Sequence, residues 1–175
     1  MFIDYAILGM FFLAALTRVI SLLKSVANER ILKKKKAIEY GRRNSKLLLV
    51  CHTLFYLSCL AEAIVLKKQV SIVSFFGAGL FIFSMSILLI VIYKLRGMWT
   101  VKLIIAPEQS INKSFLFKYI RHPNYFLNII PELISIALIC QARYTLLIGL
   151  PVYLIPLIIR IVQEEKVMKM HFSNY

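Results

Sequence analysis

The stretch "VSIVSFFGAGLFIFSMSILLIVIY", residues 70–93, has no charged side chain over 24 positions. A helix that crosses the hydrocarbon core of a bilayer needs about 20 predominantly apolar residues. Residues 70–93 therefore predict a membrane-spanning helix. The composition agrees, because 60% of the 175 residues are hydrophobic and 17% are charged, whereas soluble domains average about 45–50% apolar and about 25% charged residues.

Four more windows are long and apolar enough to span, namely residues 2–23, 47–66, 123–140 and 145–162. Only "QARY" joins the last two, so they should form an antiparallel helical hairpin. The expected fold is all-α: a polytopic membrane protein with about five transmembrane helices in a single domain over residues 1–175. The first window reads as a retained helix and not a signal peptide, since no basic residue precedes its apolar run.

Basic residues predict the orientation of these helices. Residues 24–46, expected to form a basic loop, hold nine Lys or Arg, and the mixed segment 94–121 holds six. With five spans these segments and the C-terminus share one side, which carries seventeen Lys or Arg against three on the other. Basic loops stay in the cytoplasm. We therefore expect a multi-pass protein of the cell membrane with its N-terminus outside and its C-terminus in the cytoplasm.

The basic run could attract nucleic-acid phosphates, but no stacking platform or reading helix accompanies it. Attraction to anionic lipid headgroups explains it without further assumptions, so we expect membrane lipids and no nucleic acid as partners. The three cysteines, Cys51, Cys59 and Cys140, lie in apolar surroundings and form no close CxxC pair. They predict buried hydrophobic side chains and no metal site.

The stretch "KYIRHPNYFLNIIPEL", residues 118–133, places polar side chains inside an apolar segment. Pro123 fits the first position of a helix, where its missing N–H costs nothing. Helical spacing then puts Tyr125, Asn128 and Glu132 on one face. Glu132 should lie below the membrane interface, where an ionisable residue is expensive and indicates a functional site.

The start of this helix favours an anion, because its free N–H groups and the dipole point outward. Lys118 and Arg121 add positive charge there. The hairpin should also bring Arg160 opposite Tyr125, and Glu164 near His122. The expected result is a polar cluster at the mouth of an apolar groove, suited to a polar cofactor from the cytoplasm and an apolar partner from the bilayer.

Three segments resemble the isoprenylcysteine carboxyl methyltransferase family: "WTVKLIIAPEQ" (99–109), "KYIRHPNY" (118–125) and "RIVQEEKVM" (160–168). The resemblance covers about residues 98–169 and implies S-adenosylmethionine as methyl donor. It makes residues 98–175 the cofactor-binding and catalytic region, preceded by three helices within residues 1–97. The donor-binding residues that the resemblance implies are Lys102, Arg121, His122, Pro123, Tyr125, Glu164 and Glu165. Lys118, from the basic helix start, is expected to join them.

The chemistry of the donor agrees with these residues. The basic helix start suits its carboxylate, the glutamates suit its ribose hydroxyls or ammonium, and the Tyr125 ring suits its sulfonium through cation–π attraction. Tyr125 and Arg160 are the expected catalytic residues, together with Glu132. A carboxylate acceptor needs no base, whereas a hydroxyl acceptor would need one, with Glu132 or His122 as candidates.

The sequence also departs from the family pattern. Phe115, Leu116 and Phe117 stand where relatives often carry Gly-Pro-Tyr, and Leu127 stands where a glycine often occurs. These differences leave two lipophilic acceptors open, an alkylpyrone-like polyketide lipid and an isoprenylcysteine carboxylate.

Two other classes of protein share some of these features. One is a membrane reductase that uses NADPH on a sterol or polyprenyl lipid and has a similar His-Pro-Tyr element. The other is a non-catalytic membrane scaffold whose basic run binds anionic lipid.

Overall fold

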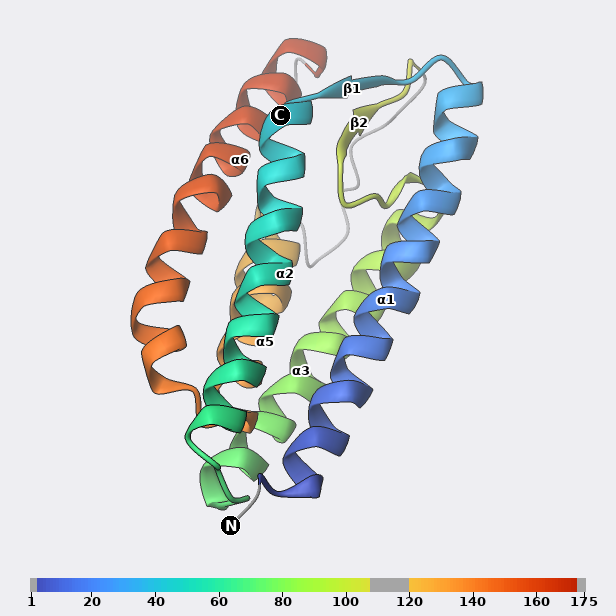
Figure 1. Ribbon diagram of the computed structural model, residues 1–175. Coiled ribbons are helices and arrows are strands. Elements are labelled where there is room, and N and C mark those ends of the chain that lie inside the picture. Colours follow the sequence, from blue (N-terminus) through green and yellow to red (C-terminus); the bar gives the residue numbers. More distant parts are fainter. Residues whose placement is uncertain (1–2, 108–119, 173–175) are drawn as a thin grey trace.

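The computed structural model describes residues 3–107 and 120–172 and shows an elongated helical bundle (Figure 1). Its elements are helices α1 (Tyr5–Lys34), α2 (Arg42–Val65), α3 (Ile72–Leu95), α5 (Ile130–Ile139) and α6 (Leu150–His171), strands β1 (Ile38–Tyr40) and β2 (Leu103–Ile105), a 3₁₀ turn η1 (Arg96–Met98), and two π-helical turns, η2 (Asn124–Ile129) and η3 (Thr145–Gly149). Of the described residues, 80% are helical, which confirms the all-α membrane class.

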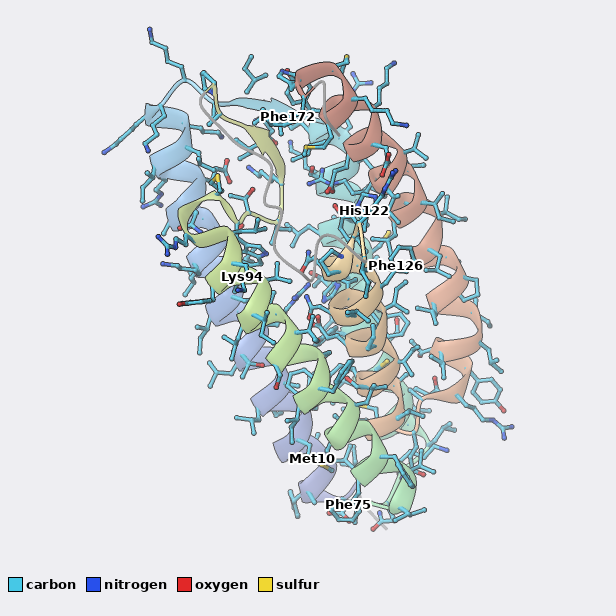
Figure 2. The ribbon with its side chains drawn as sticks, turned by 180° about the vertical axis from the view of Figure 1, so that it is seen from behind. Met10, Phe75, Lys94, His122, Phe126 and Phe172 are labelled. Atoms are coloured by element: carbon cyan, nitrogen blue, oxygen red, sulfur yellow. The ribbon has the colours of Figure 1, made fainter. Side chains whose placement is uncertain are left out.

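Four of the described helices are long and apolar enough to cross a membrane, and a fifth, shorter apolar helix covers Asn124–Ile139. In each long helix only 22% of the most apolar window is buried inside the protein. Large apolar side chains face outward instead; Phe75 and Phe126, labelled in Figure 2, are 61% and 51% exposed. Lipid is the medium that such a surface requires, so the chain is an integral membrane protein.

Helix α3 packs closely against α5 because small side chains line the contact. A Cβ atom built on Gly77 would lie 2.7 Å from the backbone nitrogen of Ile139 and 2.8 Å from the carbonyl oxygen of Ser135. Ser74 and Ser84, on the same helix, are fully buried. In membranes, such small residues let helix backbones approach each other.

The predicted turn between the last two helical segments is present, but α5 and α6 pack on different neighbours. Helix α5 lies chiefly against α3, and α6 chiefly against α2. Glu62 of α2 fixes the start of the last segment, since its carboxylate accepts hydrogen bonds from the backbone N–H groups of Tyr144 (3.0 Å) and Thr145 (2.8 Å). Glu62 therefore caps a helix.

The basic end of the bundle, where α1, α3 and α6 all finish, corrects one expectation. The segment 24–46 is not a loop, because α1 continues to Lys34 and α2 begins at Arg42. Contacts with the following polar segment support this extension; Asn28 donates to the carbonyl oxygen of Trp99 at 2.8 Å. Strands β1 and β2 pair antiparallel across the same end, which the sequence did not predict.

The helical segment Asn124–Ile139, formed by η2 and α5 and called the polar helix because it carries Asn128 and Glu132, starts as a π-helical turn and not as a regular α-helix. Pro131 has no N–H to donate to the residue four positions earlier. The N–H of Ile130 instead bonds to the carbonyl oxygen of Tyr125, five positions back. The wider turn thus accommodates Pro131 within a continuous helical segment.

Candidate functional site

The polar helix begins at the predicted position. The carbonyl oxygen of His122 accepts hydrogen bonds from the backbone N–H groups of Tyr125 (3.1 Å) and Phe126 (3.2 Å). Pro123, the residue after His122, is fully buried. This start fixes His122 and Tyr125 on the side that faces α6, and Figure 2 shows His122 close to that helix.

His122 and Tyr125 meet the carboxylates of α6. The Tyr125 hydroxyl donates to Glu164. His122 Nε2 lies 2.9 Å from Glu165 Oε1, and His122 Nδ1 lies 3.5 Å from Glu164 Oε1. The prediction that these two parts of the chain come into contact is confirmed.

Arg160 is buried and joins three other parts of the chain. Its Nε donates to the Tyr125 hydroxyl at 3.3 Å, its Nη1 to Ser45 Oγ at 2.9 Å, and its Nη2 to the carbonyl oxygen of Val101 at 3.0 Å. With a fractional exposure of 2%, this guanidinium is held rigidly. It therefore links α2, η2 and α6 beside the cluster formed by His122, Tyr125 and the carboxylates of α6.

Charge and burial act in opposite directions on His122. Burial alone would lower its pKa, but the Glu164 and Glu165 carboxylates outweigh this effect and raise the pKa above its ordinary value. A carboxylate beside a histidine favours the charged form. The imidazolium form is therefore more populated near neutral pH than in a free histidine.

The remaining predicted donor-binding residues are placed differently. Arg121 lies at the rim, with its Nη1 3.6 Å from Glu165 Oε2. Lys102 points toward α1 instead, where its Nζ lies 2.7 Å from Glu29 Oε1. Lys118 lies outside the described residues. The structure thus gathers the residues of the two family motifs and leaves Lys102 with partners of its own.

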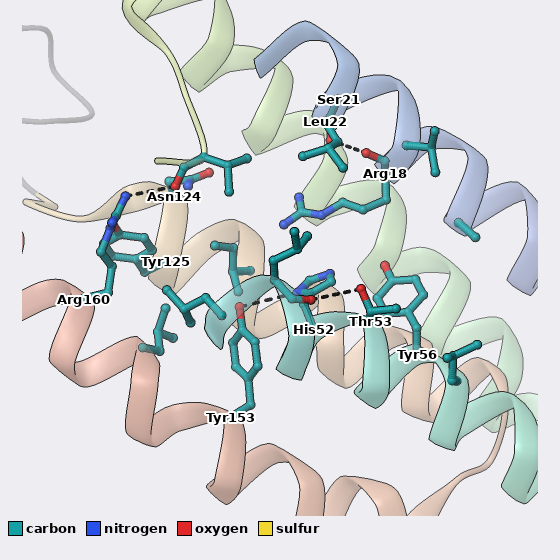
Figure 3. Close-up of a pocket in the computed structure, with 18 of the residues that line it drawn as sticks. Arg18, Ser21, Leu22, His52, Thr53, Tyr56, Asn124, Tyr125, Tyr153 and Arg160 are labelled. Atoms are coloured by element: carbon teal, nitrogen blue, oxygen red, sulfur yellow. Dashed lines mark hydrogen bonds between the residues drawn. The ribbon is translucent and has the colours of Figure 1, made fainter. Parts of the chain in front are cut away.

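A cavity of about 300 Å³ extends from this cluster into the bundle (Figure 3). Helices α1 and α2 form its sides, and Tyr125, Leu157 and Arg160 belong to its lining. Two other lining residues, Val19 of α1 and Leu57 of α2, are 52% and 55% exposed on the outer surface. The cavity therefore borders the lipid-facing surface between α1 and α2 as well as the polar cluster.

Glu132 is fully buried and stands behind the cavity wall. Its carboxylate accepts a hydrogen bond from the Tyr56 hydroxyl at 2.6 Å. It also lies 3.1 Å from Arg18 Nη1 and 3.4 Å from His52 Nε2. These three partners line the cavity, whereas Glu132 does not. Glu132 therefore acts on the cavity through its neighbours.

Four polar residues that line the cavity were not predicted as site residues. Sequence reasoning missed His52, Tyr56 and Tyr153, and it gave no role to Arg18. One signal was available: Arg18 and His52 are ionisable residues within predicted spans, which is expensive unless they face a protein interior or a wet cavity. His52 Nδ1 also lies 3.4 Å from the Tyr153 hydroxyl. Helices α1 and α2 thus supply polar side chains, Arg18 and His52, that the C-terminal motifs do not contain.

The polar side chains around the cavity lie in two layers. Four segments of the chain each contribute one residue to either layer, and in each segment these two residues are seven positions apart in sequence. The upper polar layer consists of Ser25, Ser45, Tyr125 and Arg160; Ser25 joins it by accepting a hydrogen bond from the N–H of Val101 at 2.8 Å. The lower polar layer consists of Arg18, His52, Glu132 and Tyr153. Seven residues are about two helical turns, or about 10 Å. The cavity connects the two layers.

Comparisons with known proteins identify the family of this chain. A family model described as the isoprenylcysteine carboxyl methyltransferase (ICMT) family matches residues 77–170. This match covers more than half of the chain, so the chain belongs to that family of methyltransferases. The matched region includes the polar helix and the carboxylates of α6.

Two curated relatives match along most of their length. An uncharacterized protein of Haemophilus influenzae is 51% identical over 157 residues, which cover 90% of this chain and 91% of the relative. The uncharacterized protein YpbQ of Bacillus subtilis is 31% identical over 143 residues, which cover 81% of this chain and 84% of the relative. No solved structure matches the chain.

Proposed function

We propose that the chain is an S-adenosylmethionine-dependent O-methyltransferase whose acceptor is lipophilic. The observation that supports this most strongly is the junction of two environments. The motif residues His122, Tyr125, Glu164 and Glu165 form a polar cluster, and an apolar cavity leads from it to the lipid-facing surface. A polar donor and an apolar acceptor can meet only at such a junction.

The residues of the cluster fit the groups of this donor. Glu164 and Glu165 suit its ribose hydroxyls or its ammonium. Arg121 and a protonated His122 suit its carboxylate. His122 Nδ1 is buried and makes only a long contact, 3.5 Å, with Glu164 Oε1 within the described part of the chain, so it has capacity for a further partner. The Tyr125 ring suits the positively charged sulfur.

When bound, this donor supplies a methyl group that is activated by attachment to a positively charged sulfur. The protein's contribution is positioning, which carries much of the rate of a displacement reaction. Arg160, fixed by its three hydrogen bonds, holds Tyr125 and therefore the wall between cluster and cavity. The cavity orients an apolar chain and excludes water from the acceptor oxygen.

Two acceptors remain candidates, an isoprenylcysteine carboxylate and an alkylpyrone-like polyketide hydroxyl. The carboxylate would need no base. The hydroxyl would lose a proton during transfer, and His52 is a nearer candidate than Glu132 to accept it because His52 lines the cavity. A radiolabelled methyl-transfer assay on membranes separates the two, since one product is extractable with small lipids and the other is protein-bound.

Calorimetry with S-adenosylhomocysteine and the purified protein in detergent tests donor binding. We expect binding to the wild-type protein, and affinity at least about tenfold lower for His122→Ala and Glu165→Ala, because each loses a polar group of the cluster. Arg143→Ala, at the turn on the opposite end of the bundle, is the matched control and should bind normally. Absence of binding by folded wild-type protein would contradict the proposal.

A further inference from the structure

The lining of the cavity contains arginines but no carboxylates, and the inference drawn from this rests on the proposed function. Its arginines are Arg18 and Arg160, one from each polar layer. Among the described residues that line it, there is no Asp or Glu. Glu132, which pairs with Arg18, and Glu164, which accepts from the Tyr125 hydroxyl, are not part of the lining. The wall that an acceptor would touch therefore presents two guanidinium groups and no carboxylate, while Glu132 balances the charge of Arg18 from behind the wall.

Arg18 has hydrogen-bonding capacity left on this wall. Its one ion pair within the described residues joins Nη1 to Glu132 Oε2 at 3.1 Å. A guanidinium carries five N–H donors in a planar fork, so donors remain for a ligand. Figure 3 shows the side chain extending from α1 along the cavity, toward the end that holds Asn124, Tyr125 and Arg160.

Pairing with Glu132 lowers the free-energy cost of placing Arg18 inside the membrane. A charged side chain at this depth is expensive unless it is paired. Tyr56 and His52 hold the carboxylate from two other sides, at 2.6 Å and 3.4 Å. Glu132 is thus a positioning residue: it offsets the charge of Arg18 and fixes the direction in which the guanidinium points.

We propose that Arg18 is a specificity-determining residue for the acceptor, because its guanidinium binds an ionised oxygen-acid head such as the carboxylate of the proposed function. The head lies between Arg18 and Arg160, whose planar guanidinium groups match a delocalised oxyanion. The chain leaves between α1 and α2, where Val19 and Leu57 reach the lipid-facing surface. Arg18 is therefore a specificity-determining residue that lies outside the region matched by the family model.

The test uses Trp99, the only tryptophan of the chain, which lines the cavity. Bromine quenches tryptophan fluorescence at short range, so brominated amphiphiles report occupancy. The probes are ω-bromoundecanoate and ω-bromoundecanol, in nonionic detergent at mildly alkaline pH, with unbrominated undecanoate as competitor. We expect half-maximal quenching of the wild-type protein at an approximately tenfold lower concentration of the acid than of the alcohol.

The variants separate recognition of the head from folding. Arg18→Gln should remove the preference for the acid, and Arg143→Gln should keep it. Because Arg18→Gln leaves Glu132 unpaired, the double variant Arg18→Gln/Glu132→Gln removes both charges and serves if the single variant does not fold. Equal quenching of the wild-type protein by both probes, or a preference kept in the folded double variant, would overturn the proposal.

Donor binding provides an independent readout. S-adenosylhomocysteine should bind the double variant with wild-type affinity, since Arg18 and Glu132 lie in the lower polar layer. If wild-type protein prefers the acid but does not bind S-adenosylhomocysteine, the proposed methyltransferase function fails while the assignment of Arg18 stands. If the donor binds but the preference is absent, the assignment of Arg18 fails alone.

Discussion

His122 is the residue at which pH should act on this site. Its pKa is raised because Glu164 and Glu165 favour the imidazolium more than burial disfavours it. The ordinary pKa of histidine, about 6.5, applies to the unfolded chain. A group whose pKa is raised on folding stabilises the folded state fully below the unfolded value, and this stabilisation is lost as pH rises through the folded value.

We therefore expect the melting temperature of the detergent-solubilised protein to fall as pH increases from about 6.5 through the raised pKa of His122. His122→Gln should flatten this part of the profile, because the titrating group is gone. Differential scanning fluorimetry over a pH series measures both. A wild-type profile that rises over this window, or an unchanged slope in His122→Gln, would show that His122 does not carry the effect.

Single residues also show how far sequence reasoning reaches. The contacts of Tyr125 with Arg160 and Glu164 were predicted because both ends belong to one hairpin, whose register follows from a short turn. The contact of Arg18 with Glu132 was not, since it joins residues 114 positions apart in sequence on helices with no short connection. Such a pairing depends on which helices become neighbours, and hydropathy does not contain this information.

At the scale of elements, the close contact of α3 with α5 depends on Gly77. An alanine Cβ there would meet backbone atoms of α5 at 2.7 and 2.8 Å, and backbone cannot move aside as a flexible side chain can. Gly79, two residues along the same helix, has no atom within 4 Å of its built Cβ. Gly77 and Gly79 therefore belong to the same helix, but only Gly77 is closely approached by another helix.

We expect Gly77→Ala to destabilise the protein by about 1–3 kcal/mol, as overpacking does. Gly79→Ala should be neutral or stabilising by up to about 1 kcal/mol, because alanine is the better helix former. Melting temperatures in the same detergent compare the two. If both variants melt alike, the helices do not approach each other at Gly77 as closely as described.

The lengths of the helices show that hydropathy alone does not predict where a helix ends. The apolar windows located the spans, but they mark where the lipid ends and not where a helix ends. Helix α1 continues to Lys34 because Lys, Arg and Glu are good helix formers. The strand pair was missed for another reason: β1 and β2 have three residues each, and their pairing depends on a distant segment.

At the scale of the whole molecule, the charge count predicted that residues 24–46, residues 94–121 and the C-terminal segment share one end. The described parts of these segments do meet at one end of the bundle (Figure 1). The side of the membrane that this end faces stays a prediction from the positive-inside rule.

Cysteine labelling tests the orientation. Lys35 at the basic end and Arg143 at the opposite turn are both exposed. A membrane-impermeant maleimide added to intact cells should label Arg143→Cys and not Lys35→Cys, with the unsubstituted protein as background for Cys51, Cys59 and Cys140. Lysed cells should label both variants. The reverse pattern in intact cells would place the basic end outside.

The seven-residue interval between the two polar layers restricts how the length of this chain can change. One residue inserted between Arg18 and Ser25, or between His52 and Ser45, would rotate one layer against the other by about 100°. Arg18 or His52 would then point toward lipid. A change of seven residues would restore the facing but would move the layers about 10 Å further apart. We therefore expect insertions and deletions to be tolerated only towards the ends of these helices, whatever their effect on hydropathy.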